Sequence, residues 1–269
     1  MTGSGGRLSV VGTPIGNLED LSPRALRTLS AADVIAAEDT RRAGLLLQRI
    51  GLRRPLVSYF EGNEARRAED LCARIRAGEH VALISDAGTP LVSDPGYRLL
   101  RLCIDAGLPV TVLPGPCAAI AALCGSGLPP SEFRFVGFLP RAAGKRRARL
   151  ASLRADPATL ILFEAPNRLV DTLEEIGETM GDRSAAVARE LTKIHEEFVR
   201  GRVSELRAHF SAHPPRGEIT LVVEGGAEAA PQRTPGALED AIRPALAAGA
   251  TPRDIYRVAM DVAREMGRR

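Results

Sequence analysis

The sequence contains no tryptophan, and aromatic residues make up only 4% of its 269 positions. Four cysteines and four histidines are present, but no C-x-x-C pair occurs and no histidine lies at zinc-ligand spacing from a cysteine. This pattern predicts reduced, partly buried thiols and no metal site. The scarcity of aromatic side chains also argues against base stacking as the main way of holding a nucleic acid.

Other signals are missing as well. No apolar run reaches the length of a membrane span. Residues 1–7 lack the apolar stretch of a signal peptide, so we expect a cytoplasmic protein with a flexible lead-in at 1–7. The dinucleotide fingerprint G-x-G-x-x-G and the P-loop pattern G-x-x-x-x-G-K-[ST] are both absent between strand and helix patterns, which argues against those two kinds of nucleotide site. With 45% hydrophobic and 26% charged residues, the composition is that of a globular protein with a substantial core.

Three short apolar segments are each followed by glycine and proline and then by a helix-like segment. They are residues 8–11, 81–84 and 110–113, followed by loops at 12–18, 85–96 and 114–119. In an open α/β sheet, ligands bind outside the carboxyl ends of the strands. Glycine allows a ligand to approach the backbone, and proline stiffens the loop. Three such loops in one domain therefore predict a shared pocket for a small organic ligand.

Strand and helix patterns alternate along the chain and predict an α/β protein with two αβα lobes. The N-terminal domain at 8–125 is expected to hold a mostly parallel sheet, with helices at 22–31 and 64–77 and a strand at 34–37. A Gly/Pro-rich segment separates it from a second αβ domain at 130–225. In that domain we expect strands at 133–138, 159–163, 185–188 and 218–223, a helix at 168–180, and a basic run at 141–149 that leads into a helix ending near Ala155.

The composition changes after Gly225. Residues 226–236 are an Ala/Glu/Pro/Gly linker. A small helical hairpin is expected at 237–269, in which Thr251 caps the second helix and Asp254 occupies the capping-box position. This hairpin is either a nucleic-acid-binding helix-turn-helix or a packing appendage.

The loop motifs, taken together, resemble a known superfamily. GTPIGNL at 12–18, AEDTR at 37–41, SDAGTPLVSDPG at 85–96, FEAPNRL at 163–169 and ARELTK at 188–193 occur in the order found in the tetrapyrrole-methylase superfamily of S-adenosylmethionine-dependent methyltransferases. The chain is most similar to members that methylate a ribose 2′-hydroxyl of small-subunit ribosomal RNA. The resemblance runs from about Leu8 to Gly225. It implies a cofactor cleft between the two lobes, a homodimer, and a cytidine of the decoding region as the target.

The resemblance places S-adenosylmethionine against the 85–96 and 114–118 loops, with residues of the second lobe completing the pocket. The candidate cofactor contacts are Pro14, Ala87, Gly88, Pro90, Leu91, Val92, Asp94, Pro114, Gly115, Cys117, Ala118, Phe163, Glu164, Ala165, Ile219 and Thr220, with Glu218 beside them. The backbone of Ala87, Gly88 and Pro90 is expected to hold the methionine part, and Leu91 and Val92 to form an apolar wall.

Methyl transfer from a sulfonium to a hydroxyl is an in-line displacement that requires alignment and removal of a proton, and it needs no metal. Glu38 and Asp39 follow a predicted strand, and Arg189, Glu190 and Lys193 hold the equivalent place in the second lobe. A carboxylate accepts a proton directly, whereas a lysine does so only if its pKa is lowered. Pairing of the acidic residues with Arg41, or contact with the RNA backbone, is the alternative, and the sequence alone does not choose a base.

The net charge is only +3, but the basic residues are clustered. The candidate RNA contacts are Arg41 and the run of Arg141, Lys145, Arg146, Arg147 and Arg149, which contains no acid. Such clusters neutralise phosphates of ribosomal RNA or of the small ribosomal subunit. A solvated helix face is the alternative.

Two other functions fit the same fold class. A small-molecule methyltransferase acting on a tetrapyrrole-like substrate is disfavoured because this chain has DAGTP at 86–90, where those relatives carry a Gly-Gly-Asp-Pro type loop, and because they do not need the basic run. A non-catalytic RNA-binding assembly factor is disfavoured because all three cofactor loops are intact.

Overall fold

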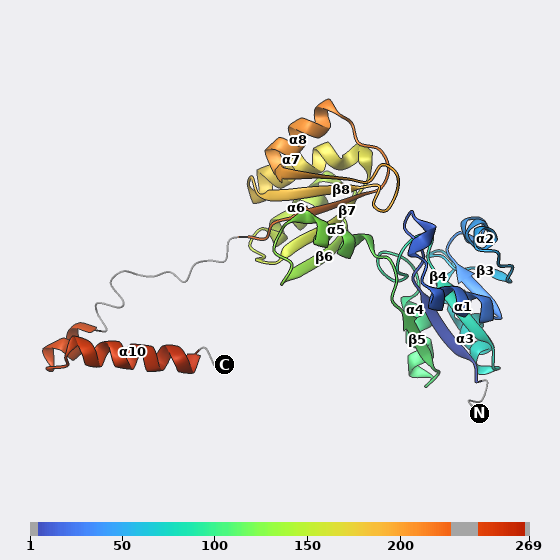
Figure 1. The fold of residues 1–269 in the computed structure, drawn as a ribbon, viewed down its shortest axis with the longest axis horizontal. Coiled ribbons are helices and arrows are strands. Elements are labelled where there is room, and N and C mark those ends of the chain that lie inside the picture. Colours follow the sequence, from blue (N-terminus) through green and yellow to red (C-terminus); the bar gives the residue numbers. More distant parts are fainter. Residues whose placement is uncertain (1–4, 227–241, 267–269) are drawn as a thin grey trace. The chain divides into compact units, whose positions relative to one another are not determined.

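The computed structural model describes residues 5–226 and 242–266. The chain divides into two compact units, residues 1–226 and residues 227–269. The first unit contains two five-stranded sheets (Figure 1). We call the half built on β1 to β5 lobe 1 and the half built on β6 to β10 lobe 2.

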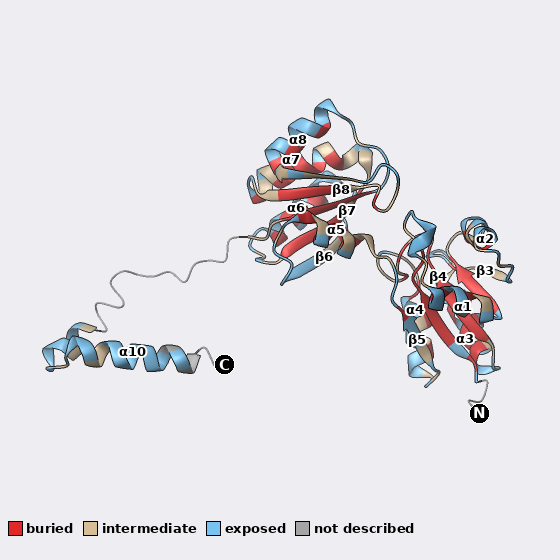
Figure 2. Cartoon of the chain, viewed as in Figure 1, coloured by how far each residue is buried: buried red, intermediate tan, exposed pale blue. Residues whose placement is uncertain are grey.

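Lobe 1 is a parallel sheet. Its strands are β1 (Arg7–Val11), β2 (Val34–Ala37), β3 (Leu56–Ser58), β4 (His80–Ile84) and β5 (Val110–Leu113), in the order β3-β2-β4-β1-β5. Every pairing within this sheet is parallel. The central strands β2 and β4 are buried along their whole length, because helices cover both faces of the sheet (Figure 2).

The two faces of this sheet carry different helix pairs. Helices α1 (Pro23–Ala31) and α2 (Thr40–Arg49) pack Ala25, Leu29 and Leu47 on one face, after the short helix η1 (Leu18–Asp20). Helices α3 (Glu64–Arg76) and α4 (Tyr97–Asp105) cover the other face. Helix α1 begins as predicted, because the Ser22 hydroxyl accepts a hydrogen bond from the Ala25 amide at 3.1 Å and Pro23 occupies the first turn.

Lobe 2 is a mixed sheet. Its strands are β6 (Phe133–Phe138), β7 (Thr159–Glu164), β8 (Ser184–Arg189), β9 (Glu197–Arg202) and β10 (Ile219–Val223), in the order β6-β7-β10-β8-β9. Only the β6–β7 pairing is parallel, since β10 runs antiparallel to both of its neighbours and β8 to β9. The last strand of the first unit therefore lies at the centre of this sheet.

Helices α6 (Ala143–Leu153), α7 (Leu169–Met180) and α8 (Val203–Ala212) cover one face of the lobe-2 sheet, and the short helix η2 (Pro166–Arg168) precedes α7. The other face is covered by α5 (Ala118–Ser126), which follows directly from β5 of lobe 1. Helix α5 packs Ala122 and Leu123 against β7, β8 and β10. One helix thus connects the lobe-1 sheet to the lobe-2 core.

The second unit is described at residues 242–266. Residues 242–247 are helical, and α10 (Pro252–Met266) follows a turn. The Thr251 hydroxyl accepts from the Asp254 amide at 3.3 Å, and the Asp254 carboxylate accepts from the Thr251 amide at 3.3 Å, which is the predicted capping box. Residues 227–236 of the predicted linker and residues 237–241 of the predicted hairpin lie outside the described residues.

Most predicted elements are present, with one clear correction. The basic run at 141–149 does not precede a helix but forms most of α6, which ends at Leu153. Strands β3 and β9 and helices α2 and α8 were not predicted, because β3 has only three residues, β9 is an edge strand rich in charge, and neither helix was recognised from its apolar pattern.

Candidate active site

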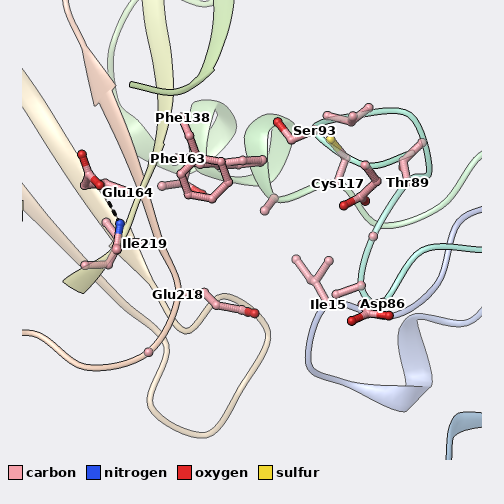
Figure 3. Close-up of a pocket in the computed structure, with 18 of the residues that line it drawn as sticks. Ile15, Asp86, Thr89, Ser93, Cys117, Phe138, Phe163, Glu164, Glu218 and Ile219 are labelled. Atoms are coloured by element: carbon pink, nitrogen blue, oxygen red, sulfur yellow. Dashed lines mark hydrogen bonds between the residues drawn. The ribbon is translucent and has the colours of Figure 1, made fainter. Parts of the chain in front are cut away.

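A cavity of about 440 Å³ lies where the carboxyl ends of the lobe-1 strands meet lobe 2 (Figure 3). This volume is within the range of small-molecule sites. Its lobe-1 wall is Ile15, Glu38, Arg42, Asp86, Ala87, Gly88, Thr89, Val92, Ser93, Asp94, Cys117 and Ala118. Its lobe-2 wall is Phe138, Phe163, Glu164, Ala165, Pro166, Gly217, Glu218, Ile219 and Thr220. In Figure 3, Phe138 and Phe163 face Ser93 and Cys117 across this space.

The three predicted loops do meet at this cavity. The Thr13 amide donates to the Gly88 carbonyl at 2.8 Å, and the Gly88 amide donates to the Thr13 carbonyl at 3.1 Å. The Thr89 hydroxyl donates to the Pro116 carbonyl at 3.0 Å. These bonds join the loops at 12–18, 85–96 and 114–119 into one wall.

The same bonds correct one expected role. Both backbone polar groups of Gly88 bond to Thr13, so this backbone is not free to hold a ligand as expected. Gly88 has a φ of 83°, and a Cβ there would lie 3.2 Å from Cγ2 of Ile15. The glycine therefore gives the loop its left-handed turn and leaves room for Ile15, which itself lines the cavity.

Most predicted cofactor contacts lie in the cavity wall. Ala87, Gly88, Val92, Asp94, Cys117, Ala118, Phe163, Glu164, Ala165, Ile219 and Thr220 line it, and Pro14, Pro90, Leu91, Pro114 and Gly115 do not. Leu91 was expected in the apolar wall, but its side chain packs on the lobe-1 core between β4 and α4. Leu91 and Ser93 have positive φ values of 72° and 68°, whereas Val92, Ser93 and Asp94 all line the cavity.

Several lining residues were missed. Thr89, Ser93 and Asp86 stand in the quoted 85–96 loop, so their position next to the chosen residues was a usable signal. Ile15 stands in the 12–18 motif next to Pro14, so its position was a usable signal as well. Phe138 ends a strand without any sequence signal of its function, and it reaches the cavity beside Phe163, with ring centroids 5.6 Å apart.

Three carboxylates gather on the lobe-1 side of the cavity, from Glu38, Asp86 and Asp94. Burial and the nearby negative charge of Glu38 raise the pKa of Asp94 to about 6. Burial and the charge of Asp86 also raise the pKa of Glu38. Asp86 is anchored, since it accepts from the Asp39 amide at 3.0 Å and from Arg42 at 3.2 Å. A cationic ligand is favoured beside such a group of carboxylates.

The side chains of the other four candidate bases and cations bond to protein groups other than these three carboxylates. Asp39 caps α2, and its hydrogen bonds with Arg41 lower the pKa of Asp39 to about 2. Arg189 pairs with Glu197 at 2.5 Å. The four residues Asp39, Arg189, Glu190 and Lys193 are not part of the cavity wall.

Lys193 lies between two carboxylates. Its Nζ is 2.9 Å from Glu190 and 3.1 Å from Glu218, and Glu218 lines the cavity. Burial acts to lower the pKa of Lys193, but the hydrogen bonds to the two carboxylates outweigh it and raise the pKa overall. The loop before it contacts lobe 1, because the Asn17 amide donates to the Thr192 hydroxyl at 3.1 Å. The two carboxylates thus hold the Lys193 ammonium group in place beside the cavity.

The predicted basic run has to be corrected at Arg146. This side chain is buried, and its guanidinium donates to both oxygens of Glu175 at 2.5 and 2.7 Å, so it does not reach a ligand in solvent. Arg147 lies 3.7 Å from Glu175 and 3.6 Å from Glu178. Arg141, Lys145 and Arg149 are exposed.

Among the described residues, no group of three or more His, Cys, Asp or Glu side chains is arranged to hold a metal ion. No helix in the described ranges is long and apolar enough to cross a membrane.

Comparison with known proteins decides the family. A family model described as Tetrapyrrole (Corrin/Porphyrin) Methylases matches residues 7–207. The chain belongs to this methylase family. Among solved structures of the family's fold, uroporphyrin-III-C-methyltransferase from Thermus thermophilus superposes with a TM-score of 0.58 at 26% identity, covering 81% of this chain and 94% of that one. A structure of that enzyme complexed with S-adenyl homocysteine gives a TM-score of 0.57 at 22% identity, covering 83% and 98%.

Curated relatives within the methylase family are more similar in sequence. The chain is 48% identical over 220 residues to Ribosomal RNA small subunit methyltransferase I of Thermotoga maritima, which covers 82% of this chain and 99% of the relative. It is 52% identical over 224 residues to the protein of the same name from Mesorhizobium japonicum, covering 82% and 76%.

Proposed function

We propose that the protein is an S-adenosylmethionine-dependent methyltransferase that methylates the ribose 2′-hydroxyl of a cytidine in the decoding region of small-subunit ribosomal RNA. The observation that carries this proposal is the 48% identity to a small-subunit ribosomal RNA methyltransferase along 99% of that protein's length. The cavity at the junction of the two lobes supports it, because it combines apolar and acidic walls.

The cavity residues fit the cofactor chemically. S-adenosylmethionine, when bound, supplies a methyl group on a positively charged sulfur. The side chains of Ile15, Val92, Phe138 and Phe163 offer apolar surface suited to a flat adenine ring. Hydroxyls and the ammonium group require hydrogen-bond acceptors, and Asp86 and Asp94 supply them.

We assign proton removal from the ribose hydroxyl to Glu38. A useful base needs access to the cavity and a pKa that is not depressed. Glu38 has both, since it lines the cavity and its pKa is raised by burial and by Asp86. Glu190 lacks both, because its hydrogen bond from Lys193 lowers its pKa and its carboxylate also accepts from the Glu218 amide at 3.1 Å.

Lys193 has a positioning role in this proposal. Its ammonium group holds Glu190 and Glu218 together at the lobe-2 rim of the cavity. Glu218 would otherwise place an uncompensated charge where the RNA backbone approaches. A cation at this rim favours binding of a phosphate-bearing substrate.

The experiment that tests the proposal is methyl transfer from radiolabelled S-adenosylmethionine to isolated small ribosomal subunits and, in parallel, to protein-free ribosomal RNA. Label at a single ribose that resists alkaline cleavage supports 2′-O-methylation. Label in neither RNA despite cofactor binding contradicts the proposal and favours a small-molecule substrate.

The role of Glu38 is tested with Glu38→Gln, which we expect to lower kcat by about 10²-fold or more while cofactor affinity stays within a few-fold. Asp39→Asn is the matched control, because it removes the adjacent carboxylate and keeps a side chain that caps α2. Equal kcat for Glu38→Gln and the wild type would remove Glu38 from this role.

We also propose a homodimer that acts in the cytoplasm, where its ribosomal substrate is made. Support comes from exposed apolar side chains on β5, α5 and β6, among them Val112, Ile120 and Phe133. Light scattering that gives twice the mass of the chain would agree with this proposal, and the mass of one chain would contradict it.

A further inference from the structure

The helix pair α1–α2 forms an arginine-rich outer surface on lobe 1. Its exposed members are Arg24, Arg27, Arg41, Arg42, Arg49, Arg53 and Arg54, the last two in the loop after α2. Neither helix contains an acidic residue. In Figure 2 the outer side of α2 is drawn as exposed. We call these seven residues the α1–α2 arginine surface.

Three of these arginines have no partner. Within residues 5–226 and 242–266, no hydrogen bond or ion pair engages the guanidinium groups of Arg27, Arg49 and Arg53. Unpaired arginine side chains on helices without acidic residues leave a positive field that attracts phosphates, and the planar guanidinium binds phosphate in a bidentate manner.

The other cation-rich helices of the first unit, α3 and α6, differ from this surface in their acidic neighbours or in their distance from the cavity. Helix α3 contains Glu64, Glu69 and Asp70 among its arginines. Helix α6 packs on α7, which contributes Asp171, Glu174, Glu175 and Glu178. Two of the four α6 cations, Arg146 and Arg147, pair with Glu175 and Glu178, and no residue of α6 lines the cavity, whereas Arg42 of the α1–α2 arginine surface does.

The arginine surface is continuous with the cavity. Arg42, in the first turn of α2, lines the cavity and donates to Asp86. Arg49 is in the last turn, seven residues farther, which at 1.5 Å per residue is about 10 Å along the helix axis. That distance is longer than the spacing between neighbouring phosphates of one strand, so the helix is long enough to contact more than one phosphate. A strand whose ribose enters the cavity at Arg42 therefore passes along α2 toward Arg49 and Arg53.

From this geometry we infer that the α1–α2 arginine surface binds the phosphates of the RNA strand that flanks the methylated ribose, and that the basic run of α6 does not. The inference rests on the proposed function, because it takes an RNA substrate as given. It assigns an RNA-binding role to Arg27, Arg49 and Arg53, at some distance from the site of methyl transfer.

The test compares two triple variants of the full chain. One is Arg27→Gln/Arg49→Gln/Arg53→Gln. The other, its charge-matched control, is Arg141→Gln/Lys145→Gln/Arg149→Gln on the outer surface of lobe 2. Binding to small-subunit ribosomal RNA is measured between about 50 and 300 mM salt, together with cofactor affinity, kcat and KM for methyl transfer.

Counterion release predicts the size of the effect. Each lost contact with a single strand reduces the slope of log K against log salt by about 0.7, so three contacts reduce it by about 2. We expect the α1–α2 triple to bind RNA roughly 10- to 100-fold more weakly near 0.1 M salt. Its KM should rise by a similar factor while kcat and cofactor affinity stay near the wild-type values. The α6 triple should keep the wild-type slope.

Three results would overturn the inference. They are an unchanged slope in the α1–α2 triple, a larger loss in the α6 triple, and equal losses in both. Replacement of the same three arginines by lysine should keep most of the slope, because the charge is retained. If the wild type labels no RNA at all, the proposed function itself fails, and this outcome is distinct from all three.

Discussion

Asp94 is held in the cavity at a free-energy cost, and Asp94→Asn should therefore stabilise the protein at alkaline pH. Burial and the charge of Glu38 raise the pKa of Asp94 from 3.8 to about 6. A raised pKa means that the folded state prefers the protonated carboxyl, so the ionised form disfavours folding. Two pKa units correspond to about 3 kcal/mol at most. Because Asp94 is only partly buried, solvent screening reduces this to about 1 kcal/mol.

The sign of the pH dependence is fixed by the direction of this shift. The stabilising contribution of the protonated Asp94 is fully present below pH about 4 and is lost as the pH rises through about 6. Asparagine has no proton to lose. The variant should therefore exceed the wild type by about 1 kcal/mol at pH 8 and equal it near pH 4.

Urea denaturation at the two pH values measures this difference, and thermal unfolding at pH 8 should show a rise in Tm of about 2–4 °C for a chain of this size. Equal stability of variant and wild type at pH 8 would refute the reasoning. A gain of the same size at pH 4 would do so as well, because it would arise from the amide group and not from the missing charge.

Two further substitutions test contacts of the fold. Gly88→Val should weaken cofactor binding by at least about 10-fold, because a Cβ at this position lies 3.2 Å from Ile15 in the cavity wall. Gly127→Val is the control, because Gly127 has a similar φ of 79° and nothing within 4 Å of its Cβ position, so this variant should impose backbone strain alone and spare binding. Equal cofactor affinities of the two variants in calorimetry would contradict this. Arg146→Ala should lower the free energy of unfolding in urea by about 3–5 kcal/mol, because it leaves Glu175 buried without its bidentate partner. Arg147→Ala should lower it by at most about 1 kcal/mol, because the Arg147 side chain is 61% exposed. Similar losses in the two variants would show that burial does not decide the strength of these pairs.

The sequence predicted the structure best where a residue type has one main role in local structure, such as capping a helix or turning a loop. Ser22 before Pro23 predicted the start of α1, because a hydroxyl at that position has one main structural role. The three loops were found because glycine and proline after an apolar strand are typical of the ligand-binding edge of an α/β sheet. The loops and the helices α1 and α3 of lobe 1 were therefore predictable from local patterns, whereas α2 and β3 were not predicted.

The errors concern properties that depend on distant partners. Arg146 and Arg149 belong to the same basic run, yet one is buried against Glu175 and the other is exposed, and only the packing of α6 on α7 distinguishes them. The second carboxylate beside Lys193, that of Glu218, is twenty-five residues away in the chain, so no local pattern shows that this lysine lies between two acids. The position of Phe138 in the cavity wall likewise depends on the packing of distant segments and not on a local pattern.

The central place of β10 in lobe 2 has a consequence for the order in which the enzyme becomes complete during synthesis. Ile219 and Thr220 of β10 line the cavity, and β10 separates β7 from β8 in the sheet. A growing chain that ends before residue 223 leaves β7 and β8 without the strand that joins them. The entropy cost of closing these long loops is offset by strand pairing only after the last strand has been synthesised. Nascent chains should therefore carry a complete lobe 1 but no working pocket until β10 has left the ribosome.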